Sequence, residues 1–171
     1  GSGLDVASCW SGGVIRFQNG ATTALPWPEN LGWQVVWSGT SAITTDHIAH
    51  FDEWRKQADL EPLNRLSDLS NRLCDTPTVT LLAAYQRALM DLDNAADLKI
   101  FSAEHQELVK IASGLGLIYK PCGAGGGDIG IAFTDLTQGT NALEDFRNAA
   151  TAAGFYCPTL ETDQHGVRLA Q

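Results

Sequence analysis

A glycine-rich stretch late in the chain is the strongest sign of chemistry in this sequence. Five of the eight residues from Gly123 to Gly130 are glycine. Without side chains to shield them, the backbone N–H groups of such a loop lie open, and open N–H groups suit the oxygens of a phosphoryl group. The alternative is a flexible turn between two strands, although ordinary hairpins need only one or two glycines. The stretch therefore predicts a phosphate-binding loop.

Two better-known glycine signatures do not fit this loop. Gly125, Gly127 and Gly130 satisfy the spacing GxGxxG, but residues 129–133 have the pattern of a strand. The dinucleotide fingerprint leads from a strand into a helix, so that interpretation fails on context. The pattern GxxxxGK[ST] is absent because no glycine precedes a lysine. The sequence also has no GxSxG elbow and no HExxH helix, so simple hydrolase and metalloprotease hypotheses have no support.

A second candidate is a carboxylate near the beginning of the chain. Asp5 lies among small residues in the stretch GSGLDVA, which would let a ligand approach the carboxylate closely. An acidic residue in a first helical turn also has a purely structural explanation, because it interacts favourably with the positive end of the helix dipole. The residue taken alone leaves both interpretations open.

Two further groups of residues are assigned to ordinary roles. His47, His50 and Glu53 stand three residues apart on an expected helix, where a metal site is imaginable. Without a distant further ligand, we expect them to be solvated surface positions. Large aromatic residues at strand and helix spacing are expected to pack in the core rather than to form a binding pocket. They are Trp27, Trp33, Trp37 and Trp54.

The elements that would position these candidates are a mixture of helices and strands. A short helix capped by Ser2 should end at Gly12 and Gly13. Apolar spacing predicts further helices from Thr44 through Trp54, over 63–73, from Pro77 through Leu92, near 103–113 and over 142–153. β-branched and aromatic runs predict strands at 14–17 and 33–37 with a loop between them, strands at 117–119 and 129–133, and closing strands at 155–157 and 167–169. Because strands and helices do not alternate steadily, we expect an α+β fold with a mainly antiparallel sheet.

Composition limits the class of protein. The 171 residues are 44% hydrophobic and 18% charged, with a formal net charge of -9, which is typical of a folded domain. The scattered Lys and Arg residues argue against a nucleic-acid surface. No apolar run of about 18 residues and no basic-then-apolar start occurs, so we expect no membrane span and no signal peptide. The four cysteines include no CxxC pair, so we expect reduced thiols in a cytoplasmic protein.

Two stretches taken together resemble a known superfamily. GSGLDVA with Gly12 and Gly13 behind it, and the later YKPCGAGGGD, are similar in order and separation to the two later motifs of GHMP kinases. The residues of these two motifs are most similar to those of the phosphomevalonate kinases. The segment from Trp37 to Thr45 also looks like the strand and loop that follow the aspartate motif in that group. The resemblance thus covers nearly the whole chain.

The resemblance implies an architecture. Residues 1–171 would be the C-terminal α+β domain of such a kinase, with a ferredoxin-like antiparallel sheet and helices packed on it. Residues 1–13 would form the catalytic-aspartate helix at the junction to an N-terminal ATP-binding domain. The glycine motif that cradles ATP in the family would lie upstream of Gly1, so we expect these 171 residues alone to phosphorylate nothing.

The resemblance also implies roles for individual residues. Asp5 would be the catalytic residue that orients or deprotonates the acceptor. Cys122 stands where the family usually shows serine, which removes a hydroxyl donor but keeps a small side chain. No metal ligand is assigned. The substrate- and phosphate-binding residues would be Gly1, Ser2, Gly3, Lys120, Cys122, Gly123, Ala124, Gly125, Gly126, Gly127 and Asp128.

The implied activity of the full-length protein is transfer of the γ-phosphoryl group of ATP, with Mg²⁺, to 5-phosphomevalonate in isoprenoid synthesis. Its partners would be this small phosphorylated substrate and the N-terminal half of the kinase. Two alternatives remain open: another GHMP kinase acting on mevalonate or a sugar, and a non-catalytic binding module that keeps the fold. Asp5 argues against the module, because a protein without phosphoryl transfer has no use for that carboxylate.

Overall fold

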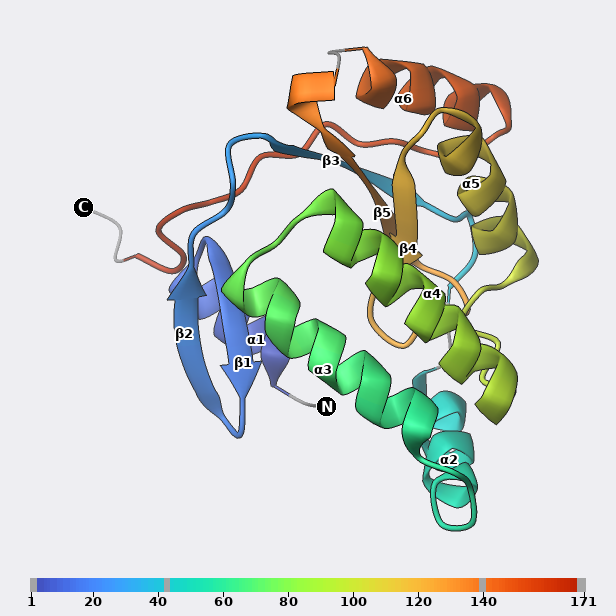
Figure 1. Cartoon of the computed structure of the whole chain (residues 1–171). Coiled ribbons are helices and arrows are strands. Elements are labelled where there is room, and N and C mark those ends of the chain that lie inside the picture. Colours follow the sequence, from blue (N-terminus) through green and yellow to red (C-terminus); the bar gives the residue numbers. More distant parts are fainter. Residues whose placement is uncertain (1–2, 42–43, 139–140, 169–171) are drawn as a thin grey trace. The chain divides into compact units, whose positions relative to one another are not determined.

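The computed structural model describes residues 3–41, 44–138 and 141–168, with the backbone alone at 44–47. These residues form six α-helices, five strands and one short 3-10 helix (Figure 1). The helices are α1 (Leu4–Ser11), α2 (Thr44–Trp54), α3 (Glu61–Asp75), α4 (Val79–Ala96), α5 (Ala103–Gly114) and α6 (Ala142–Ala152), with η1 at Leu136–Gln138. The strands are β1 (Val14–Gln18), β2 (Ala21–Leu25), β3 (Leu31–Trp37), β4 (Ile118–Pro121) and β5 (Ile129–Asp135). The expected α+β class is confirmed.

The chain divides into two compact units, and the smaller one contains the two ends of the chain: Gly1–Glu29 with Leu160–Gln171. In this unit β1 and β2 pair as an antiparallel hairpin, and α1 packs against it. The Gly13 N–H donates to the Asp163 carbonyl at 2.6 Å, and the Val167 N–H donates to the Cys9 carbonyl at 3.1 Å. These bonds hold the C-terminal segment against the end of α1.

The strand β2 was expected to be loop, and that prediction is wrong. Asn19 and Gly20 both have positive φ, 52° and 78°, which is the geometry of a two-residue hairpin turn. The turn therefore continues into a second strand. Four of the five β2 residues are exposed, so no buried face marks the strand in the sequence, and its pairing with β1 alone defines it.

The larger unit, Asn30–Thr159, is built on a three-stranded antiparallel sheet in the order β3-β5-β4. Successive residues of a strand point to opposite faces. Tyr119 packs in one core cluster with Leu108 of α5 and Phe146 of α6, whereas the Lys120 ammonium lies 6.0 Å from the centre of the Tyr85 ring on α4. Helices α5 and α6 therefore cover one face of the sheet and α4 covers the other, which confirms helices packed on an antiparallel sheet.

A second core cluster joins the helices beyond the sheet. Helices α3 and α4 lie side by side (Figure 1), as amphipathic spacing predicts. Leu89 and Leu92 of α4 pack with Phe51 and Trp54 of α2 and with residues of α3.

Helix α4 begins at Val79 rather than at Pro77, because the Thr78 hydroxyl caps it by accepting from the Leu81 N–H at 3.2 Å. Among the described helices, none combines the length and apolar character needed to cross a bilayer.

The closing strands are a further wrong prediction. Around residues 155–157 the structure has only a single bridge, in which the Trp37 N–H donates to the Tyr156 carbonyl at 2.8 Å. Pro158 follows directly and has no N–H with which to extend a ladder. Residues 167–168 form no strand, and residue 169 lies outside the described part.

The assignment of the tryptophans to the core holds only in part. Trp27, Trp33 and Trp54 are half-buried, whereas Trp37 is 42% exposed. Trp37 is the last residue of β3, which is an edge strand of the sheet. A strand end at a sheet edge leaves one side of the ring to solvent, so aromatic spacing alone does not predict its burial.

Candidate functional site

The glycine-rich loop connects β4 to β5, and hydrogen bonds fix its first half. The Cys122 N–H donates to the Ile129 carbonyl at 2.9 Å, and the Gly125 N–H donates to the Cys122 carbonyl at 3.2 Å, which closes a tight turn. The Gly126 N–H donates to the Ile100 carbonyl at 2.8 Å. The loop is therefore anchored both within itself and to the segment between α4 and α5.

The second half of the loop is joined to the residues that follow β3. The Asp128 N–H donates to the Thr40 carbonyl at 2.7 Å, and the Asp128 carbonyl accepts from the Ser38 N–H at 2.8 Å. The buried Ser38 hydroxyl in turn donates to the Thr40 carbonyl at 3.1 Å. The structure thus brings the loop together with part of the Trp37–Thr45 segment, the other stretch of this unit that resembles the kinase motifs.

One glycine of the loop is required by its surroundings. Gly125 is buried with φ of 73°, and a Cβ at this position would lie 2.5 Å from Ile100 Cγ2 and 2.8 Å from the Ile100 carbonyl oxygen. Gly123 also has positive φ, at 60°, but a Cβ there would meet nothing within 4 Å. The close approach of Gly125 to Ile100 explains why the loop needs glycine at this point.

Three amides of the loop have no acceptor among the described residues: those of Gly123, Ala124 and Gly127. Their neighbours in the loop are all hydrogen-bonded, so the three donors are held in place without being used. Backbone N–H groups fixed in this way bind anions, because no reorganisation is needed when the charge arrives. Gly123 is exposed and Ala124 is half-buried, whereas Gly127 is buried, so the oxygens of a phosphoryl group would reach the Gly123 and Ala124 amides most directly.

An apolar cavity of about 220 Å³ lies beside two of these amides. Helix α2, the segment before α5 and the loop itself contribute its walls. A ligand with its anionic group at the loop could place a short hydrocarbon portion there. The lining residues are Ile48, Phe51, Leu98, Ile100, Gly123 and Ala124.

The side chains at the start of the loop are less available to a ligand than its unbonded amides. The Lys120 ammonium donates to the Pro121 carbonyl at 2.8 Å, in addition to its position over Tyr85. Burial raises the pKa of the Cys122 thiol, and the positive charge of Lys120 acts in the opposite direction. Cys122 is therefore a neutral thiol near pH 7 and not an activated nucleophile.

Asp5 occupies the first turn of α1, in the smaller unit. Its side chain is exposed, and its carbonyl accepts from the Ser8 hydroxyl at 3.0 Å. The helix starts after Gly3, which has φ of 82° and provides no side-chain cap. Gly1 and Ser2, with the predicted Ser2 cap, lie outside the described residues. The carboxylate is thus presented on a short helix, and the loop belongs to the other unit.

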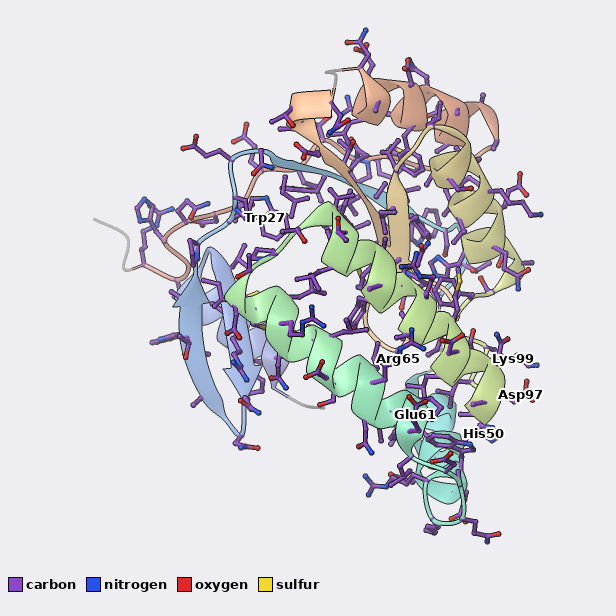
Figure 2. All side chains as sticks on the ribbon, in the orientation of Figure 1. Trp27, His50, Glu61, Arg65, Asp97 and Lys99 are labelled. Atoms are coloured by element: carbon purple, nitrogen blue, oxygen red, sulfur yellow. The ribbon has the colours of Figure 1, made fainter. Side chains whose placement is uncertain are left out.

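The histidines considered for a metal have other contacts. The His50 Nε2 lies 2.8 Å from the Ala96 carbonyl, to which it donates, and Figure 2 shows His50 at this end of α4. Glu53 forms a 2.6 Å ion pair with Lys56. The side chain of His47 lies outside the described part, within which no group of three His, Cys, Asp or Glu residues could hold a metal ion.

His105 of α5 contacts the loop and was not predicted from the sequence. This side chain has no solvent exposure, and its ring contacts the Tyr119 hydroxyl at 2.7 Å and the Gly127 carbonyl at 2.9 Å. A signal existed, because His105 shares the three- and seven-residue spacing of the buried Leu108 and Ala112. A polar residue on the buried face of a helix needs hydrogen-bond partners.

A carboxylate at the end of α4 holds the segment that anchors the loop. The two oxygens of Asp93 accept from the Ile100 and Phe101 N–H groups at 2.9 Å each. We expect Asp93→Ala to lower the free energy of unfolding by about 2 kcal/mol, since two charge-assisted bonds are lost. Urea denaturation measures the change.

Asp91→Ala is the matched control for this prediction. Asp91 lies on the same helix and forms an exposed 3.1 Å ion pair with Arg65, a residue labelled in Figure 2. Exposed pairs contribute little, so the control should lose less than about 0.5 kcal/mol. Equal losses in the two variants would show that the Asp93 bonds do not hold the segment.

Comparison with known proteins finds a relative among small-molecule kinases. No family model matches the chain. Phosphomevalonate kinase from Streptomyces sp. (strain CL190) is 32% identical over 136 residues, which cover 74% of this chain and 34% of that protein. The chain thus spans about a third of the length of this curated relative.

Solved structures share the fold. Streptococcus pneumoniae phosphomevalonate kinase in complex with phosphomevalonate and AMPPNP matches with a TM-score of 0.66 and 14% identity, over 83% of this chain and 42% of that one. Homoserine kinase from Cytophaga hutchinsonii matches with a TM-score of 0.64 and 17% identity, over 94% and 52%. In sequence and in fold the chain is thus similar to a C-terminal-like part of the GHMP superfamily kinases. Within that superfamily its sequence is distantly similar to phosphomevalonate kinase.

Proposed function

We propose that the chain is the C-terminal part of an ATP-dependent kinase that converts 5-phosphomevalonate to 5-diphosphomevalonate. The observation that carries the proposal is the loop of YKPCGAGGGD, in which three fixed amides have no acceptor in the described residues. The sequence similarity to a phosphomevalonate kinase supports the choice of acceptor. The cytoplasmic location expected from the sequence remains a prediction.

In this proposal the chain positions the reacting groups and stabilises charge. The loop amides bind phosphoryl oxygens, and the remaining substrate-binding residues follow the motif, including Gly3, Lys120 and Asp128. Asp5 orients or deprotonates the acceptor phosphate.

ATP and Mg²⁺ are the implied cofactors, and the loop suits the phosphates of ATP because it offers donors without competing side chains. Mg²⁺ in such sites keeps several waters and is held largely by the substrate phosphates with one or two carboxylates, which neutralises their charge. The chain therefore needs no dedicated cluster of metal ligands for this chemistry.

The partner of the chain in this proposal is the N-terminal ATP-binding half of the kinase. Helix α1 supports the idea, because none of its residues is buried, and Val6 and Trp10 are 74% and 71% exposed. Apolar side chains on one short helix favour burial against another protein surface. The N-terminal half would provide that surface next to Asp5.

A coupled assay of ADP release on the full-length protein tests the acceptor. We expect turnover with ATP and 5-phosphomevalonate, and at least about 100-fold lower kcat/KM with mevalonate, homoserine or galactose, whose acceptor groups lack a phosphate. No ADP release with 5-phosphomevalonate, together with turnover of one of the other acceptors, would reject the substrate but keep the kinase. No turnover of any acceptor would favour the binding module.

A further inference from the structure

His105 is a buried ionisable side chain that the proposed kinase chemistry does not use. Its ring joins two other elements of the same unit. Nδ1 lies 2.7 Å from the Tyr119 hydroxyl on β4, and Nε2 lies 2.9 Å from the carbonyl oxygen of Gly127 in the loop. The hydroxyl of Tyr119 in turn lies where a Cβ on residue 130 would be, so Gly130 leaves room for the ring.

The partners define where the protons of this pair lie. A carbonyl oxygen only accepts, so Nε2 carries the hydrogen and donates to Gly127. Burial lowers the pKa of His105, and this effect exceeds the opposing influence of the Gly127 carbonyl and of the carboxylates of Glu104 and Asp128. The ring is therefore neutral at pH 7, and Nδ1 is an acceptor. Burial raises the pKa of Tyr119 far above its ordinary value, so the phenol keeps its proton and donates to Nδ1.

The hydrogen bond from His105 completes the fixation of one peptide of the loop. The carbonyl of Gly127 is held by Nε2, and the N–H of the same peptide, on Asp128, is held by the Thr40 carbonyl at 2.7 Å. A peptide bound at both polar ends cannot rotate without breaking one of them. This limits the motion of Gly127, whose own N–H has no acceptor in the described chain.

We propose that His105 is a positioning residue for phosphate binding, which holds the Gly127 carbonyl through Nε2–H and so keeps the loop amides ready for a phosphoryl oxygen. The proposal rests on the proposed phosphate-binding role of the loop. His105 acts through Gly127 and is not itself a catalytic residue. Its role is comparable to that of a hydrogen-bonding group behind a metal ligand, which orients the atom that binds.

Titration of the 171-residue chain with inorganic pyrophosphate tests the proposal, read from the backbone ¹⁵N–¹H signals of the loop amides. His105→Leu removes both ring hydrogen bonds and should raise the Kd about tenfold, the equivalent of one lost hydrogen bond. His105→Gln keeps a side-chain N–H for the Gly127 carbonyl and should stay within about threefold of the wild type. Tyr119→Phe removes only the partner of Nδ1 and should also stay within about threefold.

The outcomes separate this proposal from the proposed function. Failure of the wild type to bind pyrophosphate at the loop amides overturns the phosphate-binding role of the loop, and this proposal with it. Binding by the wild type with an unchanged Kd in His105→Leu overturns this proposal alone, since His105 would then only fill the core. A Kd in His105→Gln as weak as that of His105→Leu overturns it as well.

A second measurement applies if His105→Leu does not fold. Ring ¹⁵N spectra of the wild type should show a neutral His105 with its proton on Nε2 at pH 7, and the Nε2 signal should move when pyrophosphate saturates the loop. The proposal is overturned if the proton lies on Nδ1, if the ring is charged, or if the Nε2 signal does not shift when pyrophosphate is added.

Discussion

Asp5→Asn in the full-length protein should lower kcat by about 10²- to 10⁴-fold, the range expected when a catalytic proton acceptor is removed. The substitution keeps the size and shape of the side chain and removes its charge. Since Asp5 is exposed on the first turn of α1, the fold should be almost unaffected. The KM values for ATP and the acceptor should change little, because the lost interaction acts in the transition state. Steady-state kinetics with a thermal unfolding curve measure both effects.

Asp145→Asn is the matched control for this variant. Asp145 is also exposed and lies in the first turn of a helix, α6, where it interacts with the helix dipole as Asp5 does. Both variants should lower the melting temperature by a similarly small amount, and only Asp5→Asn should lose activity. If the two variants retain similar activity, Asp5 has only the structural role that its position in a first turn already explains.

The helices of the larger unit could be predicted from the sequence because their cores follow one helical face. Leu63 and Leu66 of α3, and Leu89 and Leu92 of α4, repeat at helical spacing and pack in one cluster as predicted. Strand β2 could not be predicted in this way. Its residues are almost all exposed, and a strand without a buried face has no periodic signal.

The glycine-rich loop could likewise be predicted from the sequence only in part. Glycine density predicted a loop with open amides, but the sequence does not reveal which amides remain open. Gly126 and Asp128 donate to the carbonyls of Ile100 and Thr40, which lie far from them in the chain. The partners of His105 are likewise supplied by β4 and the loop. Contacts of this kind depend on tertiary packing. The residue types show only which groups need hydrogen-bond partners, and not which residues provide them.

The substitution with the largest expected effect on the loop itself is Gly125→Ala. An alanine there would adopt φ near the native 73°, which is strained for any residue with a Cβ. Its Cβ would also overlap the side chain and backbone of Ile100, with contacts of 2.5 and 2.8 Å. Strain and overlap together should lower the free energy of unfolding by about 3 kcal/mol. Urea denaturation measures this change.

Gly123→Ala separates the two causes. Gly123 has a similar φ of 60°, but an added Cβ meets nothing within 4 Å, so this variant should lose only about 1 kcal/mol from backbone strain. Pyrophosphate binding should weaken in Gly125→Ala even at temperatures where the variant is folded, because Ile100 must move and Ile100 holds the Gly126 N–H. Equal losses of stability in the two variants would mean that Ile100 moves away from the added Cβ at little energetic cost. The loop would then not be held rigidly, and its three unused amides would not be preorganised for phosphate.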